Sequence, residues 1–88
     1  MNPLIKKRSL RRLKIICGQV HGLERMIENE CYCIDLINQS LAIREALLSL
    51  EKLIMENHLA THVVEQIKAG QSKKAVKEVL SIYKFANR

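Results

Sequence analysis

Two histidines four residues apart are the side chains of this sequence best suited to bind a metal ion. His58 and His62 lie in the segment MENHLATHVVEQ, residues 55–66. If this segment is helical, both imidazoles project from the same face, one turn apart, and can bind one ion together. The pair alone is weak evidence, because most such pairs lie on solvated helix faces. HLATH also lacks the glutamate that follows the first histidine in the HExxH metalloproteases.

The cysteines are the other candidate soft ligands. The chain has three of them, Cys17, Cys31 and Cys33. An odd number of cysteines, in a chain that we expect to be cytoplasmic, argues against a disulfide framework. We interpret Cys17 as a small residue packed near Gly18. Cys31 is interpreted as a bystander beside Cys33, and the alternatives are a spare ligand or a redox partner of Cys33.

Three helical segments must position these side chains. Apolar residues recur at spacings of three and four over residues 4–28 and 34–69, the pattern of amphipathic helices. Gly70 is placed to end the second segment, and Ser72 to cap a third helix. We find no strand-like alternation, so the sequence predicts an all-α protomer with one long central helix, a single domain over residues 1–88. The apolar positions are Leu10, Leu13, Ile16, Val20, Leu23, Ile27, Ile34, Ile37, Leu41, Ile43, Leu47, Leu50, Leu53, Ile54, Leu59, Val63, Ile67, Ala75, Val79, Ile82 and Phe85.

The length of the central segment predicts a dimer. Its roughly 36 residues extend about 54 Å at 1.5 Å per residue, and two shorter helices cannot cover all of its apolar positions. Only three residues are aromatic, two Tyr and one Phe, so the core must be aliphatic, which suits helix-on-helix packing. Two chains packed antiparallel into a four-helix bundle would bury these positions.

An antiparallel dimer also suggests where a third metal ligand comes from. Cys33 and His58 are separated by about 37 Å along one straight helix, so they cannot meet within one chain. In the dimer, however, the start of one long helix lies beside the end of its partner. Cys33 of one chain could then join His58 and His62 of the other in a three-coordinate site for a soft or borderline cation.

The chain is strongly basic, with a formal charge of +6 and a pI of about 9.5. Such a surface attracts nucleic acid or an anionic membrane, and the alternative is a solvated helix face. No apolar run is long enough to cross a bilayer, and the N-terminus lacks the apolar region of a signal peptide, so a cytoplasmic location is expected. Arg44 either adds to the basic face or pairs with a nearby acid. The candidate phosphate contacts are Arg8, Arg11, Arg12 and Lys14, supported by Lys6, Lys7, Lys73 and Lys74.

Three blocks of this sequence closely resemble the CsoR/RcnR/FrmR family of small bacterial all-α repressors. They are RLKIICGQVHGLERMIE at residues 12–28, YCIDLINQSLAIREAL at 32–47 and HLATHVVE at 58–65. The resemblance implies a homodimer that assembles into a homotetramer and binds operator DNA without a helix-turn-helix. It also implies that an effector bound at an intersubunit site releases the DNA. The metal ligands carry over as Cys33, His58 and His62.

The resemblance favours Cu(I) as the effector. Thiolate and imidazole ligands suit this soft ion, which accepts low coordination numbers. Tyr32 and Glu78 match outer-shell residues of the copper branch, which implies that they hydrogen-bond near the His58 ring and couple metal occupancy to helix position. The alternatives are a partly buried loop aromatic for Tyr32 and a solvated charge for Glu78. His62 is a departure, because the copper branch usually has cysteine at this position.

Other effectors of the same family match fewer residues. The nickel and cobalt branch also uses Cys-His-His but adds an N-terminal histidine, whereas the first histidine here is His21, interpreted as a packing or surface residue. The formaldehyde branch uses an N-terminal proline amine, and Pro3 follows two other residues. The persulfide branch requires cysteine in place of His62. We therefore expect Cu(I), with Ni(II) or Co(II) as the alternative.

The sequence also bears on the DNA contacts and on other classes of function. The family usually has a basic residue where this chain has Ile15, so the set of DNA contacts is expected to differ there. A metal-trafficking or storage protein, with a basic face that only confers solubility, is the alternative from another class. An enzyme is not expected, because we find no activated nucleophile pair and no glycine-rich phosphate loop.

Overall fold

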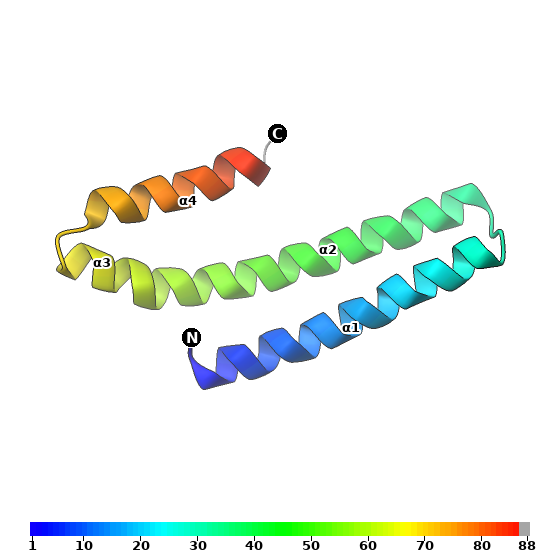
Figure 1. The fold of residues 1–88 in the computed structure, drawn as a ribbon, viewed down its shortest axis with the longest axis horizontal. Coiled ribbons are helices and arrows are strands. Elements are labelled where there is room, and N and C mark those ends of the chain that lie inside the picture. The colour runs from blue at the N-terminus through cyan, green and yellow to red at the C-terminus, as the bar shows by residue number, and fades with distance from the viewer. Residues whose placement is uncertain (87–88) are drawn as a thin grey trace. The chain divides into compact units, whose positions relative to one another are not determined.

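In the computed structural model, which describes residues 1–86, every regular element is a helix (Figure 1). The predicted all-α class is therefore confirmed, and the first helix begins one residue earlier than predicted. No helix in this part of the chain is both long and apolar enough to cross a membrane. The elements are α1 (Pro3–Glu28), α2 (Cys33–His58), the π-helical turn η1 (Leu59–Val63), α3 (Val64–Lys68) and α4 (Ser72–Ala86).

The long central helix differs from the prediction in one respect. The helical backbone continues from Cys33 to Lys68, but the π-helical turn Leu59–Val63 interrupts it. The uninterrupted α-helix predicted over residues 34–69 is therefore wrong at this turn. A π-helical turn closes its hydrogen bonds over five residues instead of four. The sequence does not reveal the turn. The apolar spacing continues across it, and the segment contains no Gly or Pro to mark a break.

The described chain divides into two compact units, Met1–Met55 and the residues from Glu56 onward. In the first unit, α1 runs antiparallel to α2 (Figure 1). Ile16 of α1 packs with Ile43 and Leu50 of α2 in a small aliphatic core, bordered by Leu23 and Ala46. The side-chain amide of Gln39 also donates from α2 to the backbone carbonyl of Gln19 over 3.2 Å.

Most of the predicted apolar stripe remains exposed within one chain. Ile37 and Leu41 of α2 are 54% and 46% exposed, and on α1 only Ile16 is buried. In the second unit Ala75 is buried and Val79 half-buried, whereas Ile82 and Phe85 are exposed. The aliphatic core that one hairpin builds is thus small compared with the apolar surface that its helices carry.

The turn between α1 and α2 is held by backbone hydrogen bonds that end the first helix. The N–H of Glu30 donates to the carbonyl of Ile27, and that of Cys31 to the carbonyl of Met26, both over 3.0 Å. This is the Schellman pattern, in which the residue after the cap adopts a left-handed conformation, usually as glycine. Here Glu30 occupies that position, with φ of 51°. The backbone is consequently fixed immediately before Cys33, the first residue of α2.

The same pattern ends α3. Gly70 has φ of 78°, its N–H donates to the carbonyl of Ile67 over 3.1 Å, and the N–H of Gln71 donates to that of Gln66 over 2.6 Å. The prediction that Gly70 ends the helix is confirmed. The prediction of Ser72 as N-cap is wrong by one residue. The carbonyl of Gln71 accepts the first bond of α4, from Ala75, so Ser72 is already inside the helix.

We expect Gly70→Ala to lower the free energy of unfolding by about 1–2 kcal/mol, the cost of a left-handed conformation for a residue with a Cβ atom. No steric term adds to this cost, since a Cβ at Gly70 meets no atom within 4 Å. Urea unfolding at one fixed protein concentration measures it. Glu30→Gly is the matched opposite change and should raise stability, by up to about 1 kcal/mol. Equal stability of the Gly70→Ala variant and the wild type would contradict this account of the turn.

Candidate metal centre and basic surface

The two histidines of the second unit lie side by side. The ring centroids of His58 and His62 are 5.4 Å apart, and the ring planes are tilted by 56°. His58 is the last residue of α2 and His62 lies in η1, so the change of helical register falls between them. His58 is half-buried and His62 is exposed.

This separation is compatible with joint binding of one ion. A zinc-like ion lies about 2.0–2.1 Å from the nitrogen of an imidazole, hence about 3.2 Å from the ring centroid. Two rings that share an ion therefore have centroids no more than about 6.4 Å apart, and the observed 5.4 Å is within that limit. The prediction that the pair shares one helix face agrees with this placement.

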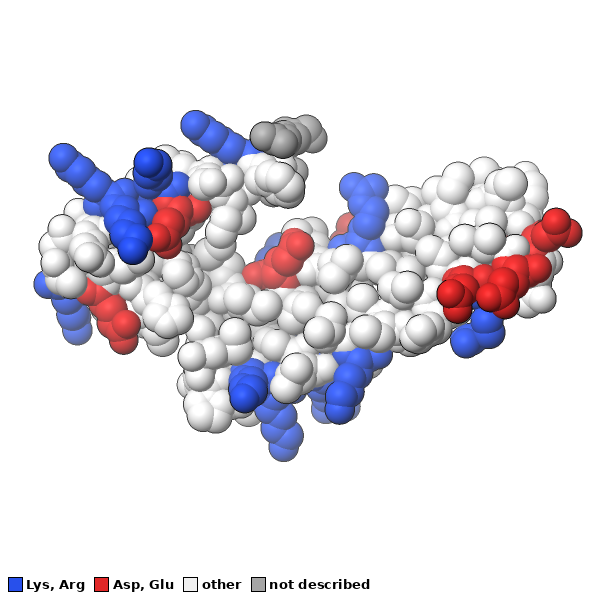
Figure 2. Space-filling model, in the orientation of Figure 1, with Lys and Arg blue, Asp and Glu red and all other residues white. Residues whose placement is uncertain are grey.

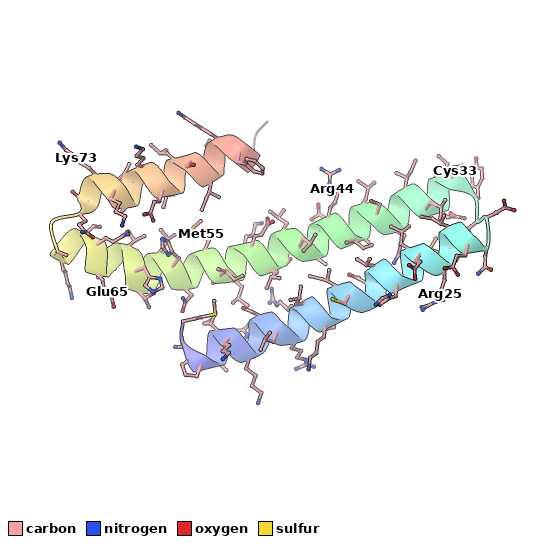
Figure 3. All side chains as sticks on the ribbon, in the orientation of Figure 1. Arg25, Cys33, Arg44, Met55, Glu65 and Lys73 are labelled. Atoms are coloured by element: carbon pink, nitrogen blue, oxygen red, sulfur yellow. The ribbon has the colours of Figure 1, made fainter. Side chains whose placement is uncertain are left out.

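Cys33 lies in the other unit, at the opposite end of α2 from His58 (Figure 3). It is exposed, and the preceding Tyr32 is 71% exposed. The Tyr32 carbonyl accepts the backbone N–H groups of Asp35 and Leu36 over 2.9 and 3.2 Å, so Tyr32, directly before the first residue of α2, accepts the first bonds of that helix. Within residues 1–86 of a single chain, no three His, Cys, Asp or Glu side chains form a group that could hold a metal ion.

The remaining residues with predicted roles are dispersed. Glu78 is half-buried on α4, in the unit that contains the histidines, and Cys31 is half-buried in the turn before Cys33. Cys17 is exposed in the single chain, and a Cβ at Gly18 would meet nothing within 4 Å, so the interpretation of Cys17 as a residue packed near Gly18 stays a prediction. His21 is a surface residue, one of its two predicted alternatives.

Sequence reasoning missed one residue beside the histidines. The hydroxyl of Thr61 donates to the backbone carbonyl of Asn57 over 2.7 Å, and Asn57 is itself buried. Threonine hydroxyls often bond to the carbonyl four residues earlier in a helix. That general preference was the available signal, and it does not distinguish this threonine from any other helical one.

Basic side chains gather on two parts of the surface, each within one unit (Figure 2). On α1 they occupy the first half of the helix, whereas Arg25 near its end has Glu24 and Glu28 close in sequence. Arg44 projects from the side of α2 that faces away from α1, so it does not extend the α1 group (Figure 3). The exposed basic residues of these two groups are Lys6, Lys7, Arg8, Arg11 and Lys14 on α1, and Lys73, Lys74, Lys77 and Lys84 on α4.

Arg12 differs from the other basic residues of α1. It is half-buried, and its guanidinium donates to the backbone carbonyl of Ser49 on α2 over 3.2 Å. Arg12 therefore ties the two helices together with at least one of its donors. The neighbouring Ile15 is 57% exposed, so an apolar side chain interrupts the basic surface there.

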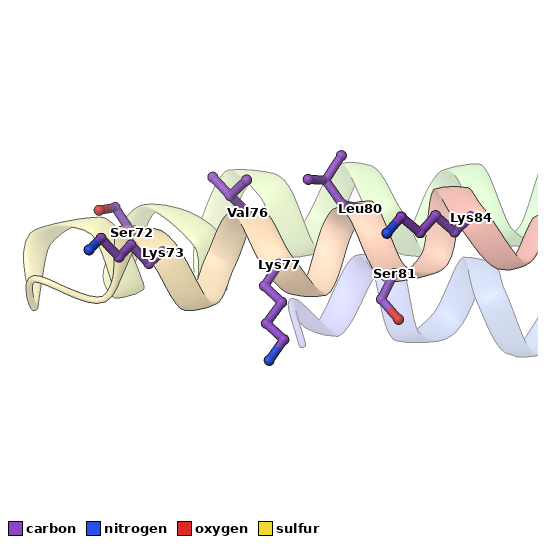
Figure 4. Close-up of a pocket in the computed structure, with 7 residues that line it drawn as sticks. All are labelled: Ser72, Lys73, Val76, Lys77, Leu80, Ser81 and Lys84. Atoms are coloured by element: carbon purple, nitrogen blue, oxygen red, sulfur yellow. The ribbon is translucent and has the colours of Figure 1, made fainter.

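One face of α4 combines lysines with apolar side chains. Val76 and Leu80 lie along a shallow groove whose other lining residues are lysines and serines (Figure 4). The lining contains no acidic residue. The polar members are Ser72, Lys73, Lys77, Ser81 and Lys84. This face thus carries positive charge over its whole length, although it also exposes apolar surface.

Nearly the whole chain is similar to known proteins. A family model described as "Metal-sensitive transcriptional repressor" matches residues 5–84. The copper-sensing transcriptional repressor CsoR of Bacillus subtilis (strain 168) is 37% identical over 73 residues, which cover 83% of this chain and 72% of that protein. CsoR of Mycobacterium tuberculosis (strain ATCC 25618 / H37Rv) is 31% identical over 80 residues, covering 91% and 67%.

A solved structure has the same fold. The crystal structure of the copper-sensing repressor CsoR with Cu(I) from Geobacillus thermodenitrificans NG80-2 is similar with a TM-score of 0.91 and 30% identity, covering 100% of this chain and 92% of that one. The resemblance inferred from the three sequence blocks is therefore confirmed.

Proposed function

Because the chain belongs to the family of metal-sensitive transcriptional repressors, we propose that it binds operator DNA in the metal-free state and releases it when Cu(I) binds. The single observation that carries this proposal is the His58–His62 pair, spaced for joint binding of one ion. Membership of a repressor family also confirms the predictions of a DNA partner and of a protein that is not an enzyme.

Cu(I) is the effector that the donor atoms favour. We assign Cys33, His58 and His62 as its ligands, because one thiolate and two imidazoles suit a soft ion of low coordination number. The relatives that carry a copper-sensing name support this choice. Ni(II) or Co(II) is the alternative, since imidazole also suits these ions, but they prefer more ligands than this set supplies.

The ligands require two chains. Cys33 begins α2 and His58 ends it, and a helix of this length rises roughly 39 Å, about 1.5 Å per residue. We propose an antiparallel homodimer in which Cys33 of one protomer meets the histidine pair of the other, and two such dimers form a homotetramer. The exposed apolar residues of α1 and α2 support this assembly, because a partner helix would remove them from water.

Outer-shell residues would couple the bound ion to the helices. We assign Tyr32 and Glu78 as hydrogen-bonding partners near the His58 ring, where such groups orient a ligand and tune its affinity. Tyr32 directly precedes α2 and Glu78 lies on α4, so a hydrogen-bond network that includes both would transmit metal occupancy to two helices. Cys31 is assigned no ligand role.

DNA would be bound through phosphate contacts from both basic groups. We assign Arg8, Arg11 and Lys14 on α1 as direct contacts, with Lys73 and Lys74 on α4 as further contacts. Arg12 can contribute only the donors that its bond to Ser49 leaves available. Backbone contacts of this kind position the protein, whereas sequence preference would come largely from DNA shape.

Release of DNA would follow from the position of the ligands. A shared ion fixes the start of one α2 against the end of another, so the spacing of the basic groups changes when the site is occupied. The mechanism needs both units of the chain, and we therefore treat residues 1–88 as one functional domain, of which 87 and 88 lie outside the described residues. As a regulator of transcription it would act in the cytoplasm.

Cys33→Ala is expected to abolish copper-induced DNA release, because it removes the only thiolate ligand. Its loss of Cu(I) affinity should exceed the roughly 10–100-fold that outer-shell changes cost. Anaerobic Cu(I) titration, followed by DNA fluorescence anisotropy, measures both effects. Cys17→Ala and Cys31→Ala are matched controls and should behave as wild type. If the Cys33→Ala protein released DNA at the wild-type copper concentration, the ligand assignment would be wrong.

Arg8→Ala and Arg11→Ala should each reduce the slope of log affinity against log salt concentration by about 1, because each removes one phosphate contact. Arg25→Ala is the control, since Arg25 lies near the other end of α1, close in sequence to Glu24 and Glu28. Titrations of metal-free protein with operator DNA at several salt concentrations give the slopes. Equal slopes for the wild type and all three variants would show that α1 does not contact the DNA phosphates.

Ile37→Glu should weaken self-association by about 100-fold or more, because each of two symmetric positions loses about 1.5–3 kcal/mol of apolar burial. Asn38→Glu, the same change at the next exposed position, should have little effect. Sedimentation velocity over a range of protein concentrations compares the two variants. Unchanged association of the Ile37→Glu variant would show that this side of α2 does not form the dimer interface.

A further inference from the structure

The helix changes its hydrogen-bonding register between the two histidines. His58 has α-helical angles, φ of −60° and ψ of −46°, and the π-helical turn Leu59–Val63 begins at the next residue. Single π-helical turns within α-helices are frequent at functional sites. A wider turn rotates successive residues through smaller angles, so the relative direction of two side chains four residues apart depends on whether this turn forms.

Thr61 forms hydrogen bonds at both boundaries of the turn. Its hydroxyl donates to the carbonyl of Asn57 over 2.7 Å, and its own carbonyl accepts the N–H of Val64, where α-helix resumes. In an unbroken α-helix, the Asn57 carbonyl would accept the backbone N–H of Thr61 itself. The hydroxyl therefore bonds to the helix at the point where the backbone pattern is rearranged.

The hydrogen bond from the Thr61 hydroxyl to the Asn57 carbonyl is shielded from water. Asn57 is buried and Thr61 is half-buried, so water competes little for the carbonyl. His58 and His62 each directly follow one of the two bonded residues. A change in the bond from Thr61 to Asn57 therefore acts on the backbone that carries both rings.

We propose that Thr61 is a positioning residue for the His58–His62 pair. Its hydroxyl stabilises the π-helical turn, and the turn sets the 5.4 Å separation of the ring centroids. The inference rests on the proposed function in taking the two rings as metal ligands. The placement of the rings is nevertheless a property of the metal-free chain, so it can be measured without any ion.

Thr61→Val and Thr61→Ser form a matched pair for the test. Valine keeps the branched shape and loses the hydroxyl, whereas serine keeps the hydroxyl and loses the methyl group. In metal-free, isotope-labelled protein, nuclear Overhauser contacts between the ring protons of His58 and His62 report their separation. We expect these contacts in the wild type and in Thr61→Ser, and their loss in Thr61→Val.

The same variants are then titrated with Cu(I) against a chromophoric chelator. Thr61→Val should bind about 10-fold more weakly, in the range found when an outer-shell partner is removed, and Thr61→Ser should bind as the wild type does. Thermal unfolding followed by circular dichroism establishes that the variants fold. Should valine prevent folding, Thr61→Ala replaces it, because alanine has the highest helix propensity.

The outcomes separate the two proposals. Wild-type ring contacts and wild-type Cu(I) affinity in Thr61→Val would overturn the positioning role and leave the copper function intact. A wild-type protein that shows no Cu(I) binding, while its ring contacts still depend on the Thr61 hydroxyl, would overturn the copper function and support the positioning role. Loss of affinity in Thr61→Val with rescue by serine supports both.

Discussion

The apolar surface of α1 and α2 exceeds what one antiparallel hairpin can bury, and the rest of the structure depends on this imbalance. The core of the first unit is a small aliphatic cluster around Ile16, Ile43 and Leu50, while Ile37, Leu41 and other large apolar residues stay exposed on the same helices. Removing such residues from water is the dominant favourable term in association. The proposed intersubunit site therefore needs no separate driving force. Burial of the exposed apolar surface of α1 and α2 in a dimer would also bring the ligands of the two chains together.

Helix ends determine where the candidate ligands lie. The bonds that terminate α1 fix the backbone at Glu30 and Cys31, so that α2 starts at Cys33. A left-handed glutamate at the position usually taken by glycine indicates that the turn is held by its backbone bonds rather than by the preference of its residue. At the other end, the π-helical turn places His62 relative to His58. Each proposed ligand thus lies at, or beside, a change of helical structure.

The sequence was sufficient to predict the all-α class, the end of a helix at Gly70 and the shared face of the two histidines. These follow from periodicity, from the left-handed preference of glycine and from a spacing of four, which are local properties. The π-helical turn was not predictable, because hydrophobic periodicity does not encode local hydrogen bonds such as the one from Thr61 to Asn57. Likewise Cys17 could not be assigned an environment from sequence, since its exposure depends on which face of α1 meets α2.

The position of His62 connects this local structure with the choice of metal. A thiolate needs only one sulfur atom within reach of the ion, whereas an imidazole must also orient its ring plane so that one nitrogen faces the ion. A chain that carries histidine where the resembled copper branch usually has cysteine therefore places a stricter demand on its backbone. The π-helical turn and the Thr61–Asn57 hydrogen bond lie within five residues of both rings, so they can orient both ring planes. Selectivity for the metal would then depend on the backbone between the ligands as well as on the ligands themselves.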